Sequence, residues 1–224
     1  MRRPFVFILL YLAAYSSIEP AIAQHQRRVA LVIGNAAYRQ SPLVSPANDA
    51  RAFATQLQRL GFEVIALTDA ARAEMLIAMR EFERRLDGDS TALLYFAGHG
   101  IQIRGTNYIL PVDASLNTEA DVVDDGIDLD SLMRALPQKH KGPNLVFVDA
   151  SRFLNVRLGP RPVERGLAPV GDLPENTLLV TAARPGTVAS DGNGANSPFA
   201  TSLMKSLDAP GVSAFAAAAR AANE

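Results

Sequence analysis

Two side chains that can transfer protons and attack carbonyl carbons follow apolar segments of this chain. His99 lies between two glycines after the apolar run 92–96, and Ser151 follows the run 145–148. Ligands of an open parallel sheet gather beyond the carboxyl ends of its strands, so we expect both side chains at one edge of such a sheet. There a histidine can take the proton of a serine hydroxyl during nucleophilic attack. The flanking glycines let the backbone approach a substrate closely.

Hydrophobic periodicity predicts the elements that must position these side chains. Five apolar runs are predicted as strands: 29–33, 63–67, 92–96, 145–148 and 177–181. Apolar residues at helical spacing predict three helices between them, with stripes at Ala50, Phe53, Ala54, Leu57 and Leu60, at Met75, Met79, Phe82 and Leu86, and at Leu129, Leu132, Met133 and Leu136. This alternation predicts an α/β fold with a mostly parallel central sheet and helices on both faces.

Residues 1–23 are predicted to form a signal peptide. Arg2 and Arg3 precede an apolar segment at 5–14, and Ala21-Ile22-Ala23 is typical of a cleavage site. The apolar segment is shorter than the roughly 20 residues that span a bilayer. We therefore expect a secreted or periplasmic protein with no stable membrane insertion after cleavage.

Composition sets further limits on the predicted mature chain. Its residues 24–224 fit a single domain, because the sequence is 48% hydrophobic and can bury a sizeable core. The sequence contains no cysteine and therefore no disulfide, and its net charge of -1 gives no support for nucleic-acid binding. Gly34-Asn35 lacks the remaining glycines of a dinucleotide motif, and the aspartates of 121–130 lack the ligand order of a calcium-binding loop. No cofactor and no metal are predicted, and we interpret the aspartates as a solvated loop that leads into a helix.

Ordered sequence blocks around these residues resemble those of caspase-like peptidases, in particular bacterial metacaspase-like proteins. Two of these blocks are the strongest. The first is 98–113, which begins with Gly98-His99-Gly100, and the second is 144–152, which contains Asp149-Ala150-Ser151-Arg152. The others are 29–38, Asn48-Asp49-Ala50, Leu60-Gly61-Phe62, 165–169 and 191–199. Together they cover nearly the whole chain from Arg28 to Leu207. The resemblance implies the three-layer caspase-like fold.

The resemblance also implies the roles of three residues. The residue at Ser151 would attack the scissile carbonyl, His99 would protonate the leaving amine, and the amide of Gly100 would help to hold the oxyanion. Relatives usually have cysteine where this chain has Ser151. A histidine can keep a nearby thiol ionised, whereas serine must lose its proton during the attack itself. We therefore expect cysteine-type cleavage to be absent or slow.

Three interpretations of Ser151 remain open. The chain is a pseudo-peptidase that binds peptides or proteins without cutting them, an engineered cysteine-to-serine variant, or an active hydrolase that uses a Ser151–His99 dyad. The retained signal peptide favours a natural variant over an engineered one. Arg152-Phe153-Leu154-Asn155 also departs from the polar run that relatives commonly have there, which favours an impaired site.

Two carboxylates near the dyad bear on substrate preference. Asp149 lies two residues before Ser151, so strand alternation places both side chains on one face. The resemblance implies a pocket for arginine or lysine before the scissile bond, with Asp191 as its second wall. For Asp149 the alternative is a hydrogen bond to local backbone, which the sequence supports equally well. For Asp191 the alternative is a turn at Asp191-Gly192, which the sequence favours over a role in the pocket.

Two further histidines and one loop have no predicted role in the dyad. His25 and His140 are predicted to be surface residues, because neither has a context like that of His99. The stretch 159–174, rich in proline and glycine, is predicted to be a long surface loop. In a peptidase of this type such a loop often borders the substrate cleft.

Overall fold

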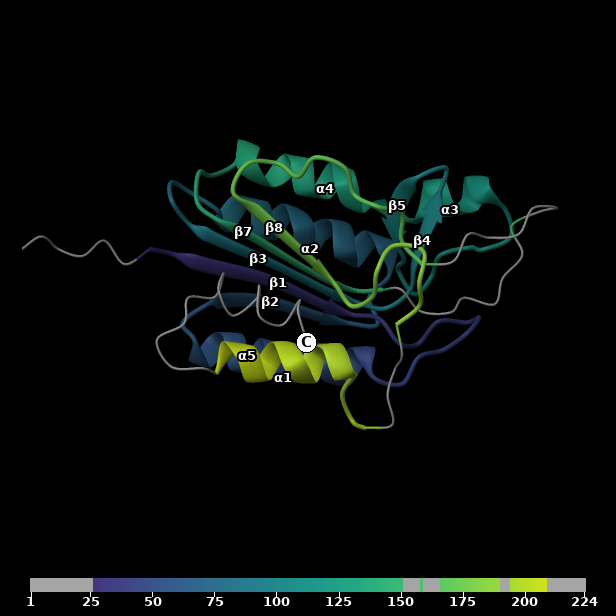
Figure 1. Cartoon of the computed structure of the whole chain (residues 1–224), viewed down its shortest axis with the longest axis horizontal. Helices are drawn as coiled ribbons and strands as arrows, with labels where there is room; N and C mark the ends of the chain where they lie inside the picture. The colour runs from purple at the N-terminus through teal and green to yellow at the C-terminus, as the bar shows by residue number, and fades with distance from the viewer. Residues whose placement is uncertain (1–25, 151–157, 159–165, 190–193, 209–224) are drawn as a thin grey trace, which may run out of the picture.

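The computed structural model describes residues 26–150, 158, 166–189 and 194–208. Its main feature is a parallel sheet with the strand order β2-β1-β3-β7-β8 (Figure 1). These strands are β1 (Arg28–Gly34), β2 (Glu63–Thr68), β3 (Thr91–Ala97), β7 (Asn144–Asp149) and β8 (Thr177–Thr181). All five apolar runs are therefore confirmed as strands.

Helices cover both faces of this sheet, as Figure 1 shows. One face carries α1 (Pro46–Arg59) and α5 (Pro198–Leu207). The other carries α2 (Arg72–Arg85) and α4 (Leu129–Ala135), which is followed by the short 3-10 helix η1 (Leu136–Gln138). The predicted three-layer α/β architecture and its three helical stripes are confirmed.

Strand alternation divides the core into two layers. Leu31 of β1 faces the layer that contains Phe82 of α2, while Val32 faces the layer that contains Phe53 of α1. All residues of β1 from Val29 to Gly34 and all residues of β3 are buried. Because both faces of these strands are covered, their sequences are continuous apolar runs rather than alternating ones.

The chain order places the carboxyl ends of β1, β3 and β7 side by side. From β1 the chain crosses to β2 on one side and then returns to β3 on the other. The register pairs Gly34 with Ala97 and Ala97 with Asp149, so these three strands end at the same level. Loops that leave a sheet on either side of such a reversal diverge and open a crevice. The segments that follow these strands therefore meet at one edge of the sheet.

A second, antiparallel sheet fixes the segment after His99. It contains β4 (Gly100–Ile103), β5 (Thr106–Ile109) and β6 (Ile127–Asp128). The residues between β4 and β5, Arg104 and Gly105, have φ angles of 52° and 82°, the positive values of a tight hairpin turn. His99 thus lies between the end of β3 and the start of β4 and is held on both sides.

Two local predictions need correction. Part of the acidic stretch forms α3 (Glu119–Asp125) rather than a loop, and Asp128 caps α4 by accepting from the amide of Ser131 at 2.9 Å. The prediction that His140 is a surface residue is wrong, because its side chain is only 4% exposed and Nε2 lies 2.8 Å from Oδ1 of Asn144. The backbone amide of its neighbour Lys141 donates to the carbonyl of Gly88. This bond holds the loop that contains His140 against the connection between α2 and β3.

The predicted signal peptide, residues 1–23, lies outside the described residues. Among the helices that the structure does describe, none combines the length and the apolar character needed to cross a membrane.

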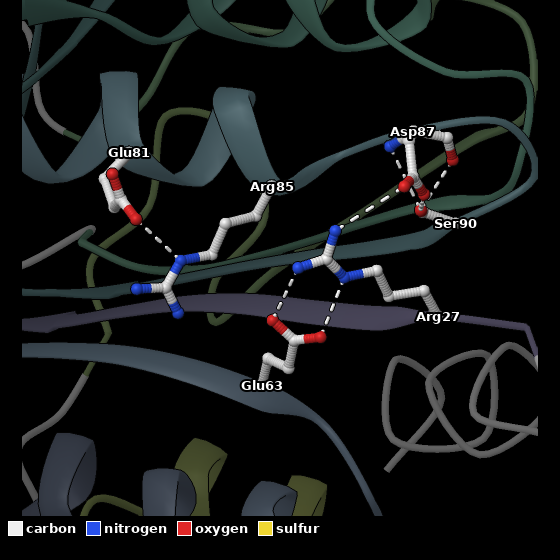
Figure 2. Close-up of polar contacts among 6 residues, drawn as sticks. All are labelled: Arg27, Glu63, Glu81, Arg85, Asp87 and Ser90. Carbon is white, nitrogen blue, oxygen red and sulfur yellow. Dashed lines mark hydrogen bonds and ion pairs between the residues drawn. The ribbon is translucent and has the colours of Figure 1, made fainter.

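A fork of charged hydrogen bonds joins the amino ends of β1 and β2 (Figure 2). Arg27 donates through Nε and Nη2 to the two carboxylate oxygens of Glu63 at 2.7 and 2.9 Å, and its Nη1 lies 3.5 Å from Asp87. The hydroxyl of Ser90 in turn donates to Asp87. The hydrogen bond from Arg27 lowers the pKa of the Glu63 carboxyl. Because both side chains of the pair are more than one-third exposed, solvent screens the interaction.

This fork predicts a pH-dependent contribution to stability. A carboxyl with a lowered pKa stabilises the fold above its usual pKa of about 4.3, and this contribution is lost as the pH falls through the lowered value. Glu63→Gln should reduce the free energy of unfolding at neutral pH by about 0.5 to 1 kcal/mol. Urea unfolding at neutral pH and near pH 3 measures the change, with the exposed Glu175→Gln as the control. A loss of equal size at both pH values would contradict this account.

Candidate active site

The structure brings His99, Gly100 and Asp149 together at the edge where β3 and β7 end. The amide of Gly98 donates to the carbonyl of Asp149 at 3.1 Å, and the amide of Gly100 donates to the carbonyl of Ala150 at 2.8 Å. These bonds continue the pairing of β3 with β7 beyond the last residues of the sheet. Ser151 and Asp191, the other two predicted site residues, lie outside the described residues.

The loop after β1 holds the His99 ring and main chain. The amide of His99 donates to the hydroxyl of Tyr38 at 2.9 Å, and Nε2 lies 2.6 Å from the carbonyl oxygen of Ser41. A carbonyl can only accept, so Nε2 carries a hydrogen, and the lone pair of the neutral imidazole is on Nδ1. The residue is fully buried. Two neutral groups of one loop, the Tyr38 hydroxyl and the Ser41 carbonyl, therefore help to fix the position of this histidine.

Tyr38 occupies its place because residue 98 has no side chain. A Cβ atom on Gly98 would lie 2.5 Å from the Tyr38 hydroxyl oxygen, closer than such atoms approach. The ring of Tyr38 packs against that of His99, with centroids 4.5 Å apart and planes inclined by 54°. Burial, with a smaller effect from the negative charge of Asp69, raises the pKa of the Tyr38 hydroxyl. The hydroxyl therefore keeps its proton, which it donates to the carbonyl of Leu110 at 2.9 Å.

The amide of Gly100 is already engaged in this conformation. Its single hydrogen is donated to the carbonyl of Ala150. An oxyanion would have to displace that carbonyl before it could accept from Gly100. The oxyanion role of Gly100 thus stays a prediction that requires a movement of the Ala150 carbonyl when substrate binds.

Two buried carboxylates meet at one serine beside this edge. Ser197, the N-cap of α5, donates its hydroxyl to Oδ2 of Asp149 at 2.7 Å and its amide to Oδ1 of Asp49 at 2.9 Å. Asn196 donates to the same Oδ1 at 2.8 Å. Both carboxylates are fully buried, and Oδ2 of Asp49 has no hydrogen-bond partner among the described residues. A buried carboxylate is costly unless a partner compensates its charge, so this pair is suited to receive a cationic group.

Asp49 was not identified as a site residue from the sequence, although a signal for it exists. It lies four residues before Phe53 and eight before Leu57, which places it on the buried face of α1. A charged residue in line with core residues is rare unless it is paired or functional. That spacing would have identified Asp49 as a candidate.

Ser41 was missed for a different reason. It acts through its carbonyl group, which every residue has, and its backbone has φ 56°, a conformation uncommon for residues other than glycine. No side-chain pattern in the sequence indicates such a role. Among the described residues no group of three or more histidine, aspartate or glutamate side chains is arranged to hold a metal ion.

Comparison with known proteins identifies the family of this chain. The human protein named mucosa-associated lymphoid tissue lymphoma translocation protein 1 is 33% identical over 129 residues, which is 57% of this chain and 15% of that protein. Its mouse homolog matches over the same share at the same identity. The chain therefore spans about 15% of the length of these curated relatives. A profile of the caspase domain, named Peptidase_C14, matches residues 27–223, nearly the whole chain, and the chain accordingly belongs to the caspase-domain peptidase family.

Proposed function

We propose that this caspase-family domain binds peptides or proteins through an arginine or lysine side chain and cleaves them poorly or not at all. The observation that carries the proposal is the pair of buried carboxylates, Asp49 and Asp149, that Ser197 joins. The backbone of Asp149 is hydrogen-bonded to Gly98, so the pair lies next to the loop that carries His99. A basic side chain bound there would lie at the same edge of the sheet as His99.

The electrostatics of the pair favour a cation over a neutral side chain. A guanidinium can donate to two carboxylates at once in a fixed planar geometry, and such charge-assisted bonds are stronger than neutral ones. Because both carboxylates are buried, water screens the attraction only weakly. Arginine should therefore bind better than lysine, and both should bind far better than an uncharged residue of similar shape.

The chemistry at position 151 supports binding over cleavage. A serine nucleophile needs a strong base, and in serine peptidases a carboxylate stabilises the imidazolium that forms. In this chain Nε2 of His99 contacts the neutral carbonyl of Ser41 instead. That partner suits a thiolate, which a cysteine can hold before attack, but it gives serine little help.

A serine-dependent hydrolase is the alternative function. The observation that favours it is the fixed orientation of His99, which is held by Tyr38 and Ser41 and therefore needs no rearrangement to act as a base. Export through the segment 1–23 is part of both proposals, and either activity would then take place outside the cytoplasm.

The proposed binding of a basic side chain by Asp49 and Asp149 predicts a charge-specific loss of binding. Asp49→Asn and Asp149→Asn should each weaken binding of a fluorescent peptide that ends in arginine amide by about tenfold or more, because each variant removes one charge-assisted contact. Fluorescence anisotropy with the protein lacking residues 1–23 measures this. The matched peptide with citrulline, which has the same shape without the charge, should bind weakly to all variants.

Two controls accompany that measurement. Asp172→Asn, which changes an exposed carboxylate, and Ser151→Ala should both bind the arginine peptide as the unchanged protein does. Equal affinity for the arginine and citrulline peptides would refute the proposed pocket.

If serine at position 151 is what limits cleavage, replacing it with cysteine should increase peptidase activity. Ser151→Cys should cleave reporter peptides after arginine or lysine. The cleavage rate of the unchanged protein should be lower by a factor of up to about 10⁴, which is the loss in rate seen when the third group of a serine triad is disturbed. Ser151→Ala and the double variant Ser151→Cys with His99→Ala serve as inactive controls. Cleavage by the unchanged protein that Ser151→Ala abolishes would establish the serine hydrolase instead.

A further inference from the structure

His99 belongs to a closed ring of hydrogen bonds with Tyr38 and Leu110. The amide of His99 donates to the Tyr38 hydroxyl at 2.9 Å, and that hydroxyl donates to the carbonyl of Leu110 at 2.9 Å. The amide of Leu110 returns to the carbonyl of His99 at 3.0 Å. Asn35 also donates to the Leu110 carbonyl, at 3.1 Å. All four residues are at most 5% exposed, so water cannot replace a bond that is lost.

The loop that supplies Tyr38 and Ser41 is itself held by a carboxylate. Oδ1 of Asp69, the residue after β2, accepts from the amides of Ala36 and Ala37, each at 2.8 Å. The carbonyl of Ala36 then accepts from the amides of Tyr38 and Leu43, both at 2.9 Å, and so closes the loop. Asp69 therefore fixes the base of the segment that contacts His99, although it does not contact His99 itself.

Backbone conformation gives a second reason to expect that this loop is held by its surroundings. Ser41 and Asp69 have φ angles of 56° and 52°, in the left-handed region. Residues other than glycine keep such conformations only where neighbouring contacts enforce them, and they are concentrated at functional sites. Here the enforced conformation directs the Ser41 carbonyl at Nε2 of His99.

We propose that Tyr38 and Asp69 are positioning residues for His99. Tyr38 fixes the main chain and the ring plane of the histidine, and Asp69 holds the loop that presents Tyr38 and the Ser41 carbonyl. Together they keep the hydrogen of the neutral imidazole on Nε2, so that its lone pair is on Nδ1. This inference rests on the proposed role of His99 in the site, but its test observes the imidazole directly and needs no turnover.

The test is nuclear magnetic resonance of the imidazole groups in protein labelled with ¹⁵N-histidine. The chain has only three histidines, so His99→Gln and His140→Gln assign the signals. In the unchanged protein the Nε2–H of His99 should exchange slowly with solvent, because it donates to Ser41. Tyr38→Phe keeps the ring and removes the hydroxyl, and it should speed that exchange by about tenfold or more.

Asp69 is tested by a pair of variants that both tolerate its positive φ. Asp69→Gly removes the acceptor and should speed the exchange of His99 in the same way, whereas Asp69→Asn keeps an oxygen acceptor and should restore slow exchange. Tyr108→Phe, which removes a tyrosine hydroxyl from β5, should leave the His99 signal unchanged. The buried His140 reports in each variant that the fold is intact.

The proposed roles of Tyr38 and Asp69 are tested separately. An unchanged His99 signal in folded Tyr38→Phe, or in folded Asp69→Gly, would remove that residue from the proposal. Should Asp69→Gly not fold, Asp69→Ala, which also removes the acceptor, takes its place with the same expected and contrary results. The imidazole signal does not depend on peptide binding. Loss of the predicted arginine-peptide binding, with slow exchange of the His99 Nε2–H retained, would therefore overturn the proposed function alone.

Discussion

The site depends on β3 being held between β1 and β7 in a parallel register that ends all three strands at one level. Gly34, Ala97 and Asp149 lie at the same level of the register, and backbone hydrogen bonds from Asn35 to Ala97 and from Gly98 to Asp149 extend the pairing past the strands. The apolar residues that bury these strands therefore also determine where His99 lies.

The polar side chains buried at this edge have different kinds of hydrogen-bond partner. Asn35 and Tyr38 join backbone groups of separate segments, which compensates the cost of burying them. Asp49 and Asp149 share a serine, and Asp49 keeps one oxygen without a protein partner among the described residues. The His99 amide and Nε2 contact two uncharged groups, the Tyr38 hydroxyl and the Ser41 carbonyl. This combination supports capture of a basic side chain more strongly than it supports activation of a serine hydroxyl.

The fold was predictable because its signals are continuous along the chain. Buried parallel strands appear as unbroken apolar runs, and the helices that cover them show clear stripes, as Phe53 and Phe82 illustrate. The burial of His140 was not predictable, because it follows from packing against a loop that is distant in sequence. The small second sheet has strands of only two to four residues, too short to show a period.

The candidate site was predictable only where it depends on side chains. His99 and Asp149 lie at the same edge of the sheet, as the order of strands predicts. Asp49 could have been identified from its helical spacing to Phe53 and Leu57. The carbonyl of Ser41 has no sequence signal, because its role comes from backbone conformation. Ser151 and Asp191 stay predictions, since they lie outside the described residues.

The central claim is that Asp49 and Asp149 form one receptor for a basic side chain. A crystal structure of the protein lacking residues 1–23, with a bound peptide that ends in arginine amide, tests this claim most directly. We predict that the guanidinium donates to both carboxylates at hydrogen-bond distances of about 2.7 to 2.9 Å. A guanidinium that lies in solvent, or that contacts neither carboxylate, would contradict the account.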